Sequence, residues 1–131
     1  MKKLYFIPFV LVLFLSTMVF SRFSIWQNIK GIDINEVSSI DFQNNKNVLL
    51  DVRTQNEFKE GHLPNSINID VMNSEFNNSI SLQNKEKNYY IYCRSGTRSL
   101  KAYSMMKNLG FKNLTNLEGG ILAYKGTVEK F

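Results

Sequence analysis

A continuous apolar and aromatic run, Tyr89–Tyr92, restricts the fold more than any other feature of the sequence. A strand without alternating polar residues is typical of the centre of a parallel sheet, where both faces are covered. The run ends directly in the loop Cys93–Ser99, and the apolar residues of the segment 100–110 then recur at roughly helical spacing. The order strand, loop, helix predicts one unit of an α/β domain.

Other short apolar segments predict further strands and a first helix. Strands are expected at residues 47–52, 66–69 and 114–117. Asp33 or Asn35 can cap a first helix that continues to about Phe42. Strands that alternate with helices indicate an α/β fold, with a mostly parallel sheet flanked by helices.

The remaining helices are predicted from their ends. Thr54 and Glu57 form a capping box, and Gly61 can end that helix in the left-handed conformation. Residues 73–84 are weakly amphipathic and predict another helix, and residues 118–120 open a terminal helical turn.

Length and composition exclude several classes of protein. A chain of 131 residues leaves room for one compact domain. Cys93 is the only cysteine and His62 the only histidine, so an internal disulfide and the usual zinc sites are excluded. The net charge of +5 is spread without a dense run of Lys and Arg. We therefore expect no metal, no cofactor and no nucleic-acid partner.

The first residues have the layout of a targeting segment. Lys2 and Lys3 precede an apolar stretch, residues 4–20, which decays into small polar residues. Residues 1–21 are therefore predicted to be a signal peptide or a membrane anchor, followed by a lead-in linker over 22–31 and the domain over 32–131. Either outcome places the domain outside the cytoplasm, in the periplasm or cell envelope, with residues 4–20 in the membrane if they are not cleaved.

The loop after the apolar run carries the candidate chemistry. Backbone amides at the start of a helix and two arginines, Arg94 and Arg98, favour an anion at its centre, and Gly96 lets the loop curl tightly. A cysteine with a pKa near 8.5 is only about 3% ionised at pH 7, so a lowered pKa would make Cys93 a nucleophile. An unpaired thiol in an exported protein is a liability unless it is used.

Several short motifs together resemble a single-domain rhodanese. These are Asp51–Arg53, Glu57–Phe58, Glu60–Pro64 with Ile67–Ile69, Cys93–Ser99 and Glu118–Gly120. The resemblance implies a rhodanese-like α/β domain with a five-stranded sheet. It also implies sulfurtransferase chemistry, in which Cys93 takes the outer sulfur of a thiosulfate-like donor as a persulfide and passes it to cyanide or a thiol. Asn65, Ser66 and Tyr124 depart from the family pattern, so the resemblance does not define the shape of the pocket rim.

The candidate site residues follow from the loop and this resemblance. Cys93 is the catalytic residue. The substrate-binding residues are those of the loop: Arg94, Ser95, Gly96, Thr97, Arg98 and Ser99. Three residues are candidates for a supporting role: Asp51, Arg53 and His62. The first two either orient the loop or form an ion pair with Glu57 or Glu60, and His62 is either a general base or part of a turn.

Two other classes of function remain as alternatives. One is an exported sulfur carrier or anion-binding module without efficient turnover, and the other is a cysteine phosphatase or arsenate reductase. Arg98 follows Cys93 one residue sooner than the arginine of the phosphatase signature would, which favours sulfur over a phosphate ester. The expected partners are a small anionic sulfur donor, a cyanide or thiol acceptor, and a thiol-redox protein.

Overall fold

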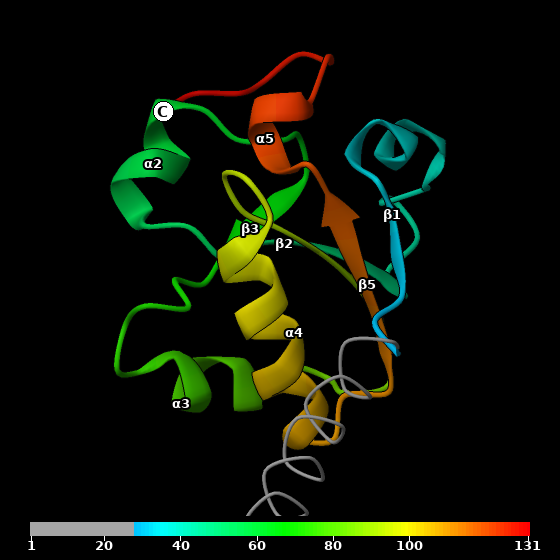
Figure 1. The fold of residues 1–131 in the computed structure, drawn as a ribbon, viewed down its shortest axis with the longest axis vertical. Helices are drawn as coiled ribbons and strands as arrows, with labels where there is room; N and C mark the ends of the chain where they lie inside the picture. Colours follow the sequence, from blue (N-terminus) through cyan, green and yellow to red (C-terminus); the bar gives the residue numbers. More distant parts are fainter. Residues whose placement is uncertain (1–27) are drawn as a thin grey trace, which may run out of the picture.

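The computed structural model describes residues 28–131, which form a five-stranded parallel sheet with helices on both faces (Figure 1). The strands are β1 (Gly31–Asp33), β2 (Asn47–Asp51), β3 (Ser66–Asn68), β4 (Asn88–Tyr92) and β5 (Asn113–Glu118). The helices are the 3₁₀ helix η1 (Ile34–Ser39), α2 (Gln55–Glu60), α3 (Phe76–Ser81), α4 (Thr97–Asn108) and α5 (Gly120–Ala123).

The strand order β1-β5-β4-β2-β3 puts β4 at the centre of the sheet. All four strand pairings are parallel, and Ile91 of β4 lies opposite Leu50 on one side and Asn116 on the other. The prediction of a central strand at Tyr89–Tyr92 is therefore confirmed, as is the α/β fold class. No pattern in the sequence predicts β1, because a strand of three residues is too short to show a period.

Each face of the sheet has its own hydrophobic core. The larger core lies under α3 and α4 and includes Phe76, Ile80 and Met106. The smaller core lies under η1 and α5 and includes Ile34 and Tyr92. Because both faces are covered, β4 is buried along most of its length, and its carboxyl end is held firmly between neighbouring strands.

Some local predictions need correction. The first helix is a 3₁₀ helix that ends at Ser39, short of the predicted Phe42, although Asp33 caps it as expected. Gly61 follows α2 with φ 163°, which is extended backbone, so the predicted left-handed end is wrong. The helix expected over residues 73–84 is shorter, Phe76–Ser81.

The predicted leader, residues 1–21, lies outside the described residues. Within residues 28–131, no helix is long and apolar enough to cross a membrane.

Candidate active site

Cys93 lies at the carboxyl end of the central strand, where β4 gives way to the loop that leads into α4. Only 1% of the residue is exposed. Crevices beyond the carboxyl ends of strands are the usual ligand sites of open parallel sheets. The order strand, cysteine loop, helix that the sequence predicts is therefore confirmed, and it places the thiol at the edge where ligands bind.

The loop is folded around the sulfur of Cys93. The backbone amide of Gly96 donates a hydrogen bond to Sγ at 3.0 Å, and Oγ of Ser99 lies 3.5 Å from Sγ. Oγ of Ser99 also lies 2.9 Å from the carbonyl oxygen of Gly96. The hydroxyl donates its one proton to that oxygen while Cys93 is a thiol, and can turn to donate it to Sγ when Cys93 is a thiolate. Gly96 has φ 112°, a conformation that favours glycine, and it lets the loop turn into α4 directly after this amide.

This arrangement favours the thiolate form of Cys93. Burial raises the pKa of the thiol, but hydrogen bonds from the Ser99 hydroxyl and from the amides of Ser99, Gly96 and Ser95 outweigh it. The net pKa is below the ordinary value for cysteine. The amides belong to the start of α4, where unpaired N–H groups and the helix dipole both favour an anion.

The short helix α5 holds the loop from outside. The amide of Ile121 donates to the carbonyl oxygen of Cys93 at 2.9 Å, and the amide of Leu122 donates to that of Arg94 at 3.2 Å. Gly120 has φ 64°, and a Cβ atom there would collide with the Arg94 carbonyl. Gly120 belongs to the motif Glu118–Gly120, and its two adjacent glycines were the one sequence signal for this close contact.

The two loop arginines differ in their surroundings. Arg98 binds Glu57 through both terminal nitrogens, at 2.7 and 2.8 Å. This pairing lowers the pKa of Glu57 to about 2. Arg94 is exposed and has no ion pair within residues 28–131. In this state Arg98 therefore positions the loop against α2, and Arg94 is the loop cation open to solvent.

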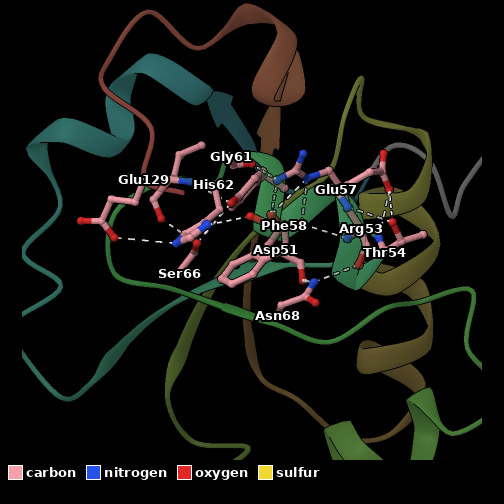
Figure 2. Close-up of polar contacts among 12 residues, drawn as sticks. Asp51, Arg53, Thr54, Glu57, Phe58, Gly61, His62, Ser66, Asn68 and Glu129 are labelled. Atoms are coloured by element: carbon pink, nitrogen blue, oxygen red, sulfur yellow. Dashed lines mark hydrogen bonds and ion pairs between the residues drawn. The ribbon is translucent and has the colours of Figure 1, made fainter. Parts of the chain in front are cut away.

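Asp51 and Arg53 form a buried ion pair with each other (Figure 2). Nη2 of Arg53 lies 2.7 Å from Oδ2 of Asp51, and it also donates to the carbonyl oxygen of Gly61 at 2.6 Å. An ion pair with Glu57 or Glu60 was predicted, and this partner is wrong, because Arg53 pairs with Asp51. The hydrogen bonds of this pair support the segment after α2 and do not reach the cysteine loop.

His62 belongs to a cluster at the carboxy terminus (Figure 2). Its ring stacks on Phe58, with centroids 3.8 Å apart, and Nδ1 lies 2.7 Å from the Phe58 carbonyl oxygen. Phe131 stacks at 5.0 Å, and the backbones of His62 and Glu129 exchange two hydrogen bonds. The contacts of His62 thus fasten the chain end to α2, as expected for a structural turn and not for a general base at Cys93.

Beside the loop lies a cavity of about 440 Å³, bounded by Ser95–Thr97 and by the end of β5. Cys93 is not part of its wall, but Gly96 is, and Gly96 contacts Sγ. No group of three or more residues suited to bind a metal ion is found in the described part of the chain.

Comparison with known proteins identifies one family. The family model for the rhodanese-like domain matches residues 36–127. Thiosulfate sulfurtransferase 18 of Arabidopsis thaliana is 37% identical over 107 residues, which cover 68% of this chain and 79% of the plant protein. A tRNA uridine(34) hydroxylase of Prochlorococcus marinus is 36% identical over 96 residues, 67% of this chain. That match covers 31% of the hydroxylase, so this chain corresponds to about a third of its length.

Solved structures agree with the fold. A rhodanese-like domain protein from Staphylococcus aureus has a TM-score of 0.67 and 28% identity, covering 79% of this chain and 99% of that one. A rhodanese-related protein from Thermoplasma volcanium has a TM-score of 0.65 and 28% identity, covering 76% of this chain and 97% of that one.

Proposed function

This chain belongs to the rhodanese-like domain family, and we propose that it is a sulfurtransferase that carries a sulfane sulfur on Cys93. The observation that carries the proposal is the 3.0 Å hydrogen bond from the Gly96 amide to Sγ, within a loop that lowers the pKa of the thiol. A relative named thiosulfate sulfurtransferase gives further support. The hydroxylase relatives are much longer, and hydroxylation is not part of the proposal.

The proposed reaction has two displacement steps at sulfur. The Cys93 thiolate attacks the outer sulfur of thiosulfate, the S–S bond of the donor breaks, and sulfite leaves with the electron pair. Cyanide or a thiolate then attacks the outer sulfur of the persulfide, and the electron pair of the broken bond returns to Sγ. Loop amides suit both steps, because they stabilise negative charge on Sγ before and after transfer.

Arg94 is the residue proposed to meet the sulfonate end of the donor. It is exposed and free of ion pairs among residues 28–131, whereas both terminal nitrogens of Arg98 are engaged by Glu57. A charge-assisted hydrogen bond of this kind contributes on the order of 1.5–3 kcal/mol before solvent screening. The role of Arg98 in donor binding, expected from the sequence, would require that it exchange partners.

The test is to incubate the purified chain with thiosulfate and measure its intact mass. One added sulfur atom, absent in the Cys93→Ser variant, is the expected result. Transfer to cyanide, followed as thiocyanate, then separates an enzyme from a carrier without turnover. A chain that gains no sulfur at neutral pH would contradict the proposal.

A cysteine phosphatase or arsenate reductase is the weaker alternative. The short spacing between Cys93 and Arg98 disfavours it, and Arg98 is already paired with Glu57. An aryl phosphate and thiosulfate assayed side by side distinguish the classes, since only the phosphatase hydrolyses the ester.

We also propose that the chain is exported, and that a thiol-redox protein is its sulfur acceptor or reductant in the cell envelope. The support is the basic start and apolar run of residues 1–21. A fusion of residues 1–30 to a reporter that is active only outside the cytoplasm tests export, and a silent reporter would reject it.

A further inference from the structure

The fold gathers lysines at the edge of the sheet opposite Cys93. All five strands are parallel, so their first residues lie at one edge, here called the amino edge. Four of the strands, β1, β2, β4 and β5, are each preceded directly by a lysine. These lysines are Lys30, Lys46, Lys87 and Lys112. The positive charge that forms no dense run in the sequence is therefore brought together by the sheet.

The register of the sheet places three of these lysines next to one another. Asn47, Asn88 and Asn113 begin β2, β4 and β5, and each is the register partner of the next. The lysines that precede them are therefore neighbours at the amino edge. The side chain of Asn88 also donates to that of Asn47 at 2.9 Å, which ties two strand starts together.

Few carboxylates offset this charge. The six residues before each of these four strands contain six lysines in all and two acidic residues, Asp41 and Glu86. Glu86 pairs with Lys112 at 2.9 Å, and both side chains are exposed. None of the other five lysines forms an ion pair within the described part of the chain. The amino edge is therefore a cationic surface.

A cavity of about 370 Å³ lies at this edge, where β1, β4 and β5 begin. Lys30 and Lys112 both belong to its wall, and so do the strand starts Asn88 and Asn113. No carboxylate is among the described residues that line it. The charge of this wall therefore selects an anion.

Tyr103 of α4 brings a further hydrogen-bond donor to the same wall. Only 6% of the residue is exposed, and its Oη accepts a hydrogen bond from the amide of Lys30 at 3.3 Å. The hydroxyl proton has no acceptor among residues 28–131. Buried polar groups nearly always use their donors, so this proton favours an acceptor bound in the cavity. Two ammonium groups and one hydroxyl suit a phosphate group.

The position of the leader indicates where that phosphate comes from. The apolar stretch 4–20 ends ten residues before Lys30, and ten residues span at most about 35 Å. With this stretch in a membrane, the amino edge is held close to the lipid headgroups. Figure 1 shows β5 running from this edge toward α5, which binds the cysteine loop at the opposite edge.

We propose that the amino edge docks on an anionic membrane surface, and that the cavity between Lys30 and Lys112 takes the phosphate of a phospholipid headgroup. This contact is separate from the membrane segment predicted at residues 4–20, and it does not depend on sulfur transfer. Docking in this orientation turns Cys93 away from the membrane, toward donors and acceptors in solution.

The test uses the full chain in lipid nanodiscs whose headgroups carry a sparse gadolinium label. Paramagnetic broadening of backbone amide NMR signals then reports which edge of the domain lies near the headgroups. In phosphatidylcholine mixed with phosphatidylglycerol, the signals of Asn88 and Asn113 should broaden strongly and that of Gly96 weakly. In phosphatidylcholine alone, which has no net charge, this difference should be lost. The same pattern in both lipids would overturn the inference.

Two double variants separate this surface from net charge. Lys30→Gln with Lys112→Gln removes the charges of the cavity wall, and each lysine near an anionic surface contributes roughly fivefold to binding. The docked population relative to the free one should therefore fall roughly 25-fold. Lys59→Gln with Lys125→Gln is the matched control, because these exposed lysines follow α2 and α5 away from the amino edge. An equal loss in both double variants would overturn the inference.

A second measurement identifies the source of the phosphate. Inorganic phosphate and a short RNA are titrated separately into the full chain in phosphatidylcholine nanodiscs, and shifts of the Lys30 and Tyr103 amides are followed. Both are expected to act more weakly than anionic lipid, and Tyr103→Phe should weaken docking on that lipid about fivefold. Shifts with phosphate or RNA but no docking on anionic lipid would overturn the inference, whereas failure to load sulfur would count against the proposed function alone.

Discussion

Both carboxylate oxygens of Glu57 accept hydrogen bonds from the terminal nitrogens of Arg98, at 2.7 and 2.8 Å. Glu57 also accepts hydrogen bonds from the amide and the hydroxyl of Thr54, which closes the capping box of α2. Arg98 belongs to the first turn of α4, next to Ser99. This ion pair therefore connects the start of α2 to the helix that carries the cysteine loop.

Glu57→Gln is expected to lower the free energy of unfolding at pH 7 by about 1 kcal/mol, the usual loss for a cap combined with a partly exposed ion pair. Arg98 lowers the pKa of Glu57 from 4.5 to about 2. The carboxylate therefore stabilises the fold above about pH 4.5, and this contribution is lost as the pH falls toward 2. Urea unfolding at several pH values measures the free energy of unfolding of wild type and variant, and the difference between the two should become smaller as the pH falls. A difference that is independent of pH would contradict this role of Glu57.

Cys93→Ser is expected to abolish sulfur loading and leave the fold in place. The serine hydroxyl can accept the hydrogen bond from Gly96, so the free energy of unfolding should change by no more than about 1–2 kcal/mol. The hydroxyl lacks the acidity of the thiol, and Cys93 is the only cysteine of the chain. Intact mass after thiosulfate treatment checks the loss of sulfur loading, and circular dichroism checks that the fold is retained. Sulfur transfer that survives in this variant would rule out the persulfide mechanism.

Ser99→Ala is expected to raise the pKa of Cys93. The Ser99 hydroxyl, 3.5 Å from Sγ, is among the groups that lower this pKa, and its loss disfavours the charged form. The rate of alkylation by iodoacetamide, measured against pH, should reach half its maximum at a higher pH in the variant. Ser95→Ala is the control, because its amide and not its hydroxyl acts on the thiol. Equal profiles for wild type and Ser99→Ala would count against the role of the hydroxyl.

Much of the fold could be predicted because the relevant signals are local. The apolar run Tyr89–Tyr92 predicts the central strand, and Thr54 with Glu57 predicts the start of α2. The three residues of β1 carry no such signal, since their pairing with β5 depends on tertiary structure. The extended conformation of Gly61 has a similar origin: its carbonyl oxygen is bound by the buried guanidinium of Arg53, a contact that no sequence pattern reveals.

In the candidate site, too, local features could be predicted and contacts between distant residues could not. The cradle around Cys93 follows from the loop sequence, because a strand end, a glycine and a helix start define it. The partner of Arg98 could not be predicted, because Glu57 lies 41 residues away and charge alone fits several carboxylates. The sequence suggested two roles for Glu57, capping of α2 and an ion pair with the Asp51–Arg53 segment. The structure confirms the cap and pairs the carboxylate with Arg98 instead.

Gly120→Ala is expected to reduce sulfur transfer as well as stability. A methyl group there would collide with the Arg94 carbonyl and push the loop away from α5. Gly110→Ala is the matched control, since Gly110 also has a positive φ, 94°, but has room for the added Cβ. Both variants should lose about 1–2 kcal/mol of stability from the backbone conformation. Loss of the transfer rate in Gly120→Ala alone is the expected outcome, and equal rates in the two variants would contradict it.

His62→Ala is expected to destabilise the chain without changing the chemistry of Cys93. The His62 ring is 3% exposed and packs against both Phe58 and Phe131, so its removal should cost about 2–4 kcal/mol. His62→Phe keeps the stacking and removes both ring nitrogens, which separates packing from proton transfer. Transfer rates per folded molecule should equal that of wild type in both variants, with the same dependence on pH. A pH profile altered in the stably folded His62→Phe variant would instead assign His62 to the reaction.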